Sequence, residues 1–308
     1  MRISGPTDLL QAVPYLLGFH PTDSLVVLGL GTPGGGRLVV TARMDLADLA
    51  DPPALAQLVA ALARGGAGEL VAVVYADAEL DVPLDQHLGP QRLPWSGLAP
   101  ALAHECERVG CALGDVLLVA DGRWWSYTCE SDLCCPQSGT PLADAPSEFV
   151  AEATFAGMVA LPDRKSLEAT LDPVSPDRLA ATAQLIAAEE HRGVAKVLAA
   201  DRDRAARSVK RAVFAAARRA DADSRCTLSD ADIARFGSAL SDIVLRDPVW
   251  LAIDAGRLIG DPLWRELARR LPGHYAAGPL FLFGWASWRA GNGALAAIAA
   301  ERAVERAP

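Results

Sequence analysis

The sequence changes character near residue 146, and this change restricts the possible folds more than any other feature. Before it, short apolar runs typical of strands alternate with segments of helical apolar spacing. After it no strand signal is present, and from Pro176 onward the spacing is helical throughout. A chain of 308 residues is long enough for two domains. We therefore expect an α/β domain over residues 1–146 and a helical domain over residues 147–308, with the boundary in the proline-containing stretch between about 146 and 176.

The first domain contains five runs that predict strands, over residues 24–30, 37–44, 69–76, 115–119 and 123–127. A glycine-rich link joins the first two runs and Asp121-Gly122 joins the last two, and such short links favour antiparallel hairpins. Helices are predicted from Pro52 to Gly65 and over residues 98–109. The predicted fold class is α/β, a mixed sheet of about five strands with flanking helices, followed by an all-helical C-terminal region.

The second domain contains helical spacing over residues 177–200, 201–220, 229–245, 262–271 and 279–289. Near its end, small residues at Gly284, Ala296 and Ala303 follow the spacing of a tetratricopeptide-type helical hairpin, with Gly291-Asn292-Gly293 at the turn. Small residues at these positions let two helices approach closely. We therefore expect the helical domain to end in a tetratricopeptide-like hairpin.

Composition limits the classes of partner and the cellular location. The formal net charge of −9 argues against nucleic acid or an anionic membrane surface as the partner. The first residues lack the apolar core of a signal peptide. The apolar stretch from Tyr275 to Trp288 is shorter than the roughly 20 residues that cross a bilayer. We therefore expect a cytoplasmic protein with no membrane span, in which cysteines stay reduced.

Three of the six cysteines, Cys129, Cys134 and Cys135, lie within seven residues directly after the second predicted hairpin. Clustered thiols in a reducing compartment indicate metal or redox chemistry, because thiolates are preferred zinc ligands. We predict these three residues as metal ligands, with zinc as the candidate cofactor. Two alternatives stay open: buried cysteines that pack as small apolar residues, and a redox pair between Cys129 and Cys134 or Cys135.

Tetrahedral zinc requires a fourth ligand from another segment of the chain. Cys106, Cys111 and His104 are candidates, since they lie on or just after the predicted helix that precedes the hairpin. The spacing between Cys129 and the cysteine pair exceeds the two intervening residues typical of zinc turns.

A second candidate site lies before the first predicted strand. His20, Asp23 and Ser24 combine the residue types of a hydrolytic triad, and they are the predicted catalytic residues if the protein is an enzyme. The alternative is structural, because Pro21, Asp23 and Ser24 are all residues that form turns.

The run Pro14-Tyr15-Leu16-Leu17-Gly18-Phe19-His20-Pro21 supports a family assignment. The likeness extends to the Cys-Cys-Pro turn and to Gly284-Trp285-Ala286 near the end. Over nearly its whole length the chain resembles an actinobacterial family of uncharacterised proteins, catalogued as a domain of unknown function. The resemblance implies no activity, so the function has to be argued from the residues.

Two functions are compatible with these features. The first is a non-enzymatic cytosolic protein that binds a ligand or partner, with a protein partner contacting the C-terminal helices around Trp285 and Trp288. The alternative is a hydrolase-type or metal-dependent enzyme that uses the His20 turn or the cysteine cluster. The lack of any complete catalytic motif favours the first function.

Overall fold

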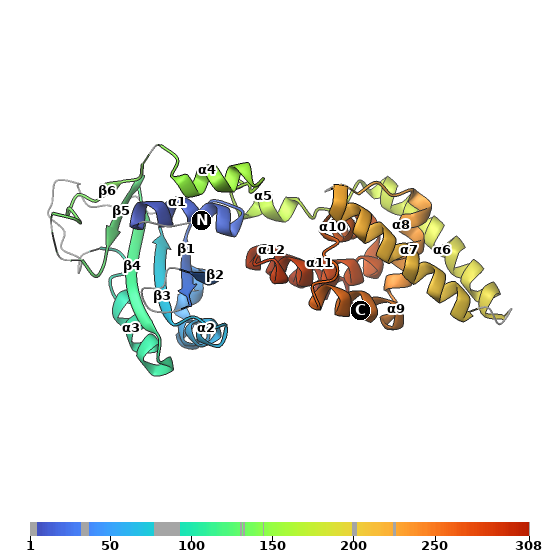
Figure 1. Ribbon diagram of the computed structural model, residues 1–308, viewed down its shortest axis with the longest axis horizontal. Coiled ribbons are helices and arrows are strands. Elements are labelled where there is room, and N and C mark those ends of the chain that lie inside the picture. Colours follow the sequence, from blue (N-terminus) through green and yellow to red (C-terminus); the bar gives the residue numbers. More distant parts are fainter. Residues whose placement is uncertain are drawn as a thin grey trace. The chain divides into compact units, whose positions relative to one another are not determined.

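The computed structural model describes residues 5–31, 37–76, 93–129, 131, 133–143, 145–198, 202–223 and 226–307. The chain forms two compact units that divide after Ser166, an α/β unit and a helical unit (Figure 1). Each unit has a core of its own, as the change in sequence pattern predicts.

The α/β unit contains a six-stranded mixed sheet. Its strands are β1 (Ser24–Leu30), β2 (Leu38–Asp45), β3 (Glu69–Tyr75), β4 (Ala112–Ala120), β5 (Arg123–Ser126) and β6 (Thr140–Pro141). The order across the sheet is β2-β1-β3-β4-β5-β6, in which β3 and β4 are parallel and all other neighbours antiparallel. The predicted α/β mixed sheet is therefore confirmed.

Both predicted hairpins are present. In the β4–β5 turn, Asp121 and Gly122 have φ of 47° and 68°, a conformation that favours Asp-Gly. The sixth strand was not predicted, because its two residues carry no strand pattern of their own. It forms because the turn after β5 leads the chain back, so that Thr140 pairs with Trp124.

Helices cover the sheet. Those of the α/β unit are α1 (Pro6–Leu17), the 3₁₀ helix η1 (Leu46–Ala50), α2 (Pro52–Arg64), α3 (Leu98–Val109) and α4 (Glu148–Phe155). Helices α2 and α3 pack on one face, where Leu62 and Leu102 join Leu25 and Val74 in the main core. Val26, which alternates with Leu25 and so points to the other face, is also fully buried.

Helix α4 accounts for the position of the boundary. Phe149 and Ala153 of α4 pack against Ala12 of α1, and the two helices lie side by side (Figure 1). Further along, Phe19 and Leu161 form a β-bridge. These contacts place residues 147–166 in the α/β unit, so the division falls inside the predicted stretch between about 146 and 176, later than its first residue. Local periodicity could not show which unit a short helix would pack against.

The helical unit begins within α5 (Arg164–Ala169) and continues through α6 (Pro176–Leu198), α7 (Arg202–Asp223), α8 (Asp230–Leu240), α9 (Ile243–Asp254), α10 (Asp261–Arg270), the 3₁₀ helix η3 (Gly273–Ala276), α11 (Ala277–Arg289) and α12 (Gly293–Arg306). The single helix predicted over 229–245 is in fact two helices. It breaks at Ser241–Asp242, where the Asp242 carboxylate accepts the Val244 N–H and starts α9. Among the helices described here, none is both long and apolar enough to cross a bilayer.

At the C-terminal end, α11 and α12 pack against each other as a helical hairpin. A Cβ added at Gly284 would lie 3.3 Å from the Ala296 carbonyl oxygen and from the Ala299 Cβ, so the glycine allows the close approach of the helices. Asn292 starts α12 by accepting the Leu295 N–H. The likeness of this helical hairpin to a tetratricopeptide repeat stays a prediction.

Candidate functional site

The three clustered cysteines lie on the turn that joins β5 to β6. Their sulfur atoms all lie within 4.8 Å of one another. The sulfurs of Cys129 and Cys134 are in contact at 3.1 Å. Three residues predicted as ligands are therefore brought together by the fold.

Backbone and ring contacts shape this turn. The N–H groups of Cys134 and Cys135 both donate to the Ser131 carbonyl, at 3.2 and 2.8 Å. The indole N–H of Trp125 donates to the Gln137 carbonyl at 3.0 Å. Gly139 has φ of 75°, and a Cβ there would lie 2.5 Å from the Trp125 ring, so only glycine fits where the chain passes the indole.

A polar network anchors the start of the turn. One Asp115 carboxylate oxygen accepts hydrogen bonds from the Val116 N–H, the Ser126 hydroxyl and the Thr128 hydroxyl, at 2.8, 2.8 and 2.6 Å. The Ser126 oxygen in turn accepts the Cys129 N–H at 3.0 Å. Sequence reasoning missed Asp115, although a charged residue inside a predicted strand is itself a signal of a polar role.

The cysteines of the turn have different acidities. Hydrogen bonds from Cys134 and Cys135, with a backbone hydrogen bond at Ser131, lower the pKa of the Cys129 thiol. Burial, followed by the interactions with Cys129 and Cys134, raises the pKa of Cys135 to about 12. The lowered pKa favours the thiolate form of Cys129, which is the form that binds metals.

The predicted sources of a fourth ligand are not part of this sulfur cluster. Cys106 is 1% exposed in the core under α3, and burial raises its pKa to about 11. The Cys111 thiol donates to the Ala67 carbonyl at 3.1 Å. His104 is exposed on α3. Within the described residues the metal-binding group consists of the three turn cysteines alone.

The His20 turn has the geometry of a structural element. Ser24 is fully buried; its hydroxyl donates to the Thr22 carbonyl at 2.5 Å and accepts from the Arg43 Nε at 2.9 Å. Asp23 has φ of 43°, and its carbonyl accepts the Leu46 N–H. The His20 side chain is exposed, and the backbone N–H of His20 donates to the Leu161 carbonyl. A substrate could not reach the Ser24 hydroxyl, so this geometry favours the turn-forming interpretation over catalysis.

Comparison with known proteins adds one match. A family described as "Domain of unknown function (DUF4192)" matches residues 6–308. The chain belongs to the DUF4192 family. The predicted resemblance to an uncharacterised family is thereby confirmed over nearly the whole chain. The chain matches no curated protein and no solved structure.

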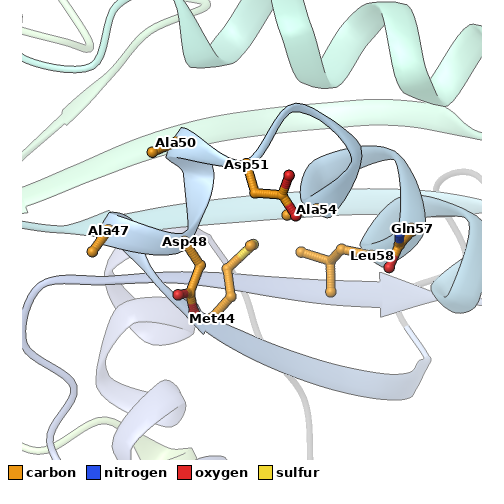
Figure 2. A pocket seen from close by; sticks show the side chains of 8 residues that line it. All are labelled: Met44, Ala47, Asp48, Ala50, Asp51, Ala54, Gln57 and Leu58. Atoms are coloured by element: carbon orange, nitrogen blue, oxygen red, sulfur yellow. The ribbon is translucent and has the colours of Figure 1, made fainter.

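This DUF4192 chain also has a hollow of about 760 Å³ beside strand β2. Its lining comes from the end of β2, from η1 and from the first turns of α2, and comprises Met44, Ala47, Asp48, Ala50, Asp51, Ala54, Gln57 and Leu58. Figure 2 shows Met44 and Leu58 next to each other in the lining, with Asp48 beside Met44 and Asp51 at the start of α2 above them. The hollow thus combines an apolar surface with negative charge.

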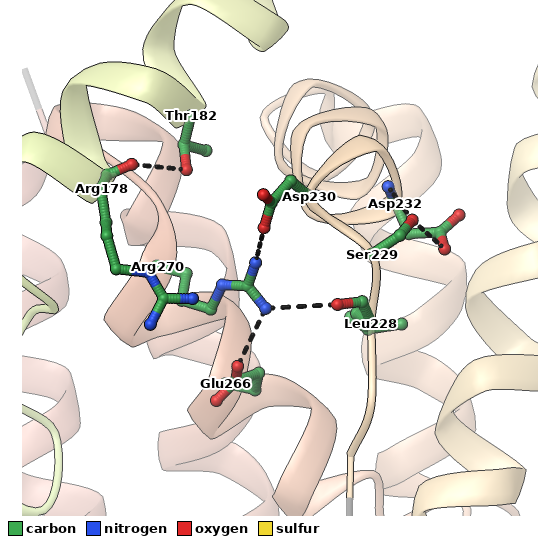
Figure 3. Close-up of polar contacts among 8 residues, drawn as sticks. All are labelled: Arg178, Thr182, Leu228, Ser229, Asp230, Asp232, Glu266 and Arg270. Atoms are coloured by element: carbon green, nitrogen blue, oxygen red, sulfur yellow. Dashed lines mark hydrogen bonds and ion pairs between the residues drawn. The ribbon is translucent and has the colours of Figure 1, made fainter.

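In the helical unit of the DUF4192 chain, Arg270 of α10 is 7% exposed and binds three partners (Figure 3). Its guanidinium donates to Glu266 at 3.1 Å, to the Leu228 carbonyl at 3.3 Å and to the Asp230 carboxylate. These bonds join α10 to the start of α8, where Ser229 accepts the Asp232 N–H. We interpret this cluster as structural, since both terminal nitrogens of the guanidinium donate to groups within the unit.

An aromatic group lies between α9 and α11. The ring of Trp250 contacts those of Phe281 and Trp285 edge-on, with centroids 5.9 and 5.5 Å apart. Trp288 lies 5.1 Å from Trp285 and is 57% exposed, and Arg246 lies over the Phe281 ring. Further exposed apolar side chains on α9 are Ile243, Val244 and Leu251.

Proposed function

We propose that this DUF4192 protein is a cytoplasmic, non-enzymatic binding protein whose α/β unit holds one zinc ion at the cysteine turn. The observation that carries the proposal is the grouping of the Cys129, Cys134 and Cys135 sulfurs within 4.8 Å. Thiolates bound to one tetrahedral zinc at about 2.3 Å lie roughly 3.8 Å apart. The observed separations are compatible with this value after small side-chain rotations.

Contacts that do not involve the sulfurs hold the described part of the turn, which also supports a binding site. Its backbone is held by the Ser131 carbonyl, by the Trp125 ring and by the network of Asp115. A preformed loop reduces the conformational entropy that is lost when a metal binds. The fourth coordination position would take water or a donor from another segment.

Binding is favoured over metal-dependent catalysis because of how the neighbouring carboxylate is used. Asp115 accepts three hydrogen bonds through one oxygen, and it therefore orders the turn. The hydrolase alternative is weakened further by the burial of Ser24.

The test is the metal content of the full-length protein, purified under reducing conditions without chelator. We expect about one zinc per chain, lost in Cys129→Ser with a lower melting temperature. Cys226→Ser is the matched control, since Cys226 lies in the helical unit, outside the sulfur group. If the protein carries no metal, and added cobalt(II) produces no thiolate charge-transfer band, the zinc proposal is wrong.

A second candidate function is the binding of a protein partner through the helical unit. The specific support is the exposure of the large apolar side chains of Trp288 on α11 and of Val244 and Leu251 on α9, two helices that pack against each other. We expect Trp288→Asp to abolish capture of a partner from native extract, measured by quantitative mass spectrometry. Phe155→Asp is the matched control, because Phe155 is also a large aromatic side chain, is 97% exposed, and lies on α4 of the other unit. Equal losses in both variants would contradict a specific surface.

A further inference from the structure

Strand β2 is an edge strand. It pairs with β1 on one side, and among the described residues no strand pairs with its other side. The Leu46 N–H donates to the Asp23 carbonyl at 2.9 Å, which identifies that pair as hydrogen-bonded. Hydrogen-bonded and non-hydrogen-bonded pairs alternate along an antiparallel ladder, so Arg43 and Thr41 stand in non-hydrogen-bonded pairs with β1. The backbone N–H and C=O groups of these two residues therefore point away from β1, toward the open edge. An extended peptide could pair with these groups.

A strand added beside β2 would place alternate side chains over the hollow shown in Figure 2. Val40, Ala42 and Met44 of β2 point to the face of the sheet that α2 covers, because they pack against the core cluster that contains Leu62. Side chains of an added strand alternate in the same way. Those on the α2 side would reach the hollow, which includes Met44 at the end of β2 and Leu58 on α2.

The chemistry of the hollow selects the kind of side chain that fits. Asp48 and Asp51 contribute two carboxylates, and neither forms an ion pair within the described part of the chain. Asp51 stands at the N-cap of α2, yet its side chain makes no capping hydrogen bond. An arginine or lysine complements this arrangement, with its aliphatic stem on Met44 and Leu58 and its charge at the carboxylates.

We propose that β2 binds an extended, basic segment of a partner protein by strand addition, with an arginine or lysine of that segment in the hollow beside Asp48 and Asp51. The net charge of −9 would favour the approach of such a segment. A second copy of this chain fits less well. Its β2 would present Arg43, whose guanidinium is already bonded to Ser24 and Asp45. This inference does not rest on the zinc proposal.

The experiment uses the full-length protein and a short fluorescein-labelled peptide of alternating valine and arginine. We expect the peptide to bind in fluorescence anisotropy and the matching valine–glutamate peptide not to bind. A peptide methylated on alternate backbone nitrogens should also fail, because it cannot complete the strand hydrogen bonds. Methylation leaves the side chains unchanged, so this comparison separates strand pairing from simple charge attraction.

Two double variants with the same change in charge complete the test. Asp48→Asn/Asp51→Asn should weaken binding of the valine–arginine peptide by about five- to tenfold. The control Asp121→Asn/Asp254→Asn alters two exposed aspartates elsewhere and should leave binding unchanged. The proposal is overturned if the peptide does not bind, if the methylated peptide binds equally well, or if the control variant loses as much affinity. It is also overturned if light scattering shows a dimer that Thr41→Lys disrupts, since β2 would then be occupied by a second copy.

Discussion

Replacing Gly139 by alanine tests whether the Trp125 ring holds the cysteine turn in place. Gly139 has φ of 75°, and its added Cβ would lie 2.5 Å from the Cε2 and Cζ2 atoms of the ring. Gly122→Ala is the matched control, because Gly122 has φ of 68° but its Cβ would meet no atom within 4 Å. The two variants share the same backbone strain and differ only in the contact with the ring.

The expected magnitudes follow from that difference. Placing an L-residue in the left-handed region costs about 1–2 kcal/mol in either variant. Overlap with the ring adds about 1–3 kcal/mol in Gly139→Ala, including the weakened hydrogen bond from Trp125 to the Gln137 carbonyl. We therefore expect the free energy of unfolding to fall by about 2–5 kcal/mol for Gly139→Ala and by about 1–2 kcal/mol for Gly122→Ala.

The assay is urea unfolding of the full-length protein, followed by near-ultraviolet circular dichroism. Zinc affinity of both variants is measured in parallel by competition with a chromophoric chelator. We expect a lower zinc affinity only in Gly139→Ala, because displacement of the ring shifts the turn that carries the sulfurs. Equal losses of stability in the two variants would refute the reasoning, since the ring contact would then contribute nothing.

Three further predictions concern the helical unit. Arg270→Met should lower the free energy of unfolding by about 2–3 kcal/mol. The loss is smaller than for a fully buried pair because the partner carboxylates of Arg270 are partly solvated. A loss under about 1 kcal/mol in urea unfolding would contradict this prediction. Gly284→Leu should cost about 1–3 kcal/mol by forcing α11 and α12 apart, and an unchanged unfolding midpoint would count against the close packing. The hydrogen bond from the Tyr275 hydroxyl to Glu190 raises the pKa of Tyr275 to about 12. The folded-state pKa of Tyr275 thus lies above the unfolded value of about 10. The stabilisation that the bond contributes is therefore fully present below pH 10 and is lost as the pH rises through 12. In a spectrophotometric titration Glu190→Gln should lower one late tyrosine midpoint, and an unaltered curve would show that the bond is absent.

Part of the candidate site was predictable from the sequence. Three cysteines within one short turn lie near one another because the chain between them is short, and their grouping is confirmed. The Asp115 network was not predictable in the same way. It depends on the register in which Leu117 pairs with Ser126, and this register brings Asp115 close to a hydroxyl eleven residues further on. Cys106 and Cys111 were predicted as possible ligands from proximity in the sequence. In the structure Cys106 is buried in the core, and the Cys111 thiol donates a hydrogen bond to the Ala67 carbonyl.

Local sequence determined the type of most elements in this protein. Apolar periodicity identified the first five strands and most of the longer helices, although α1, α4 and α5 were not predicted. Turn residues such as Asp121-Gly122 determined the hairpins, because these signals act between residues close in the chain. Tertiary structure alone decided the sheet order with β2 at an edge, the pairing of β6, the packing of α4 on α1 and the burial of Ser24. Each of these four features depends on contacts between segments far apart in sequence. The free energy of such contacts cannot be read from the residue pattern of either segment alone.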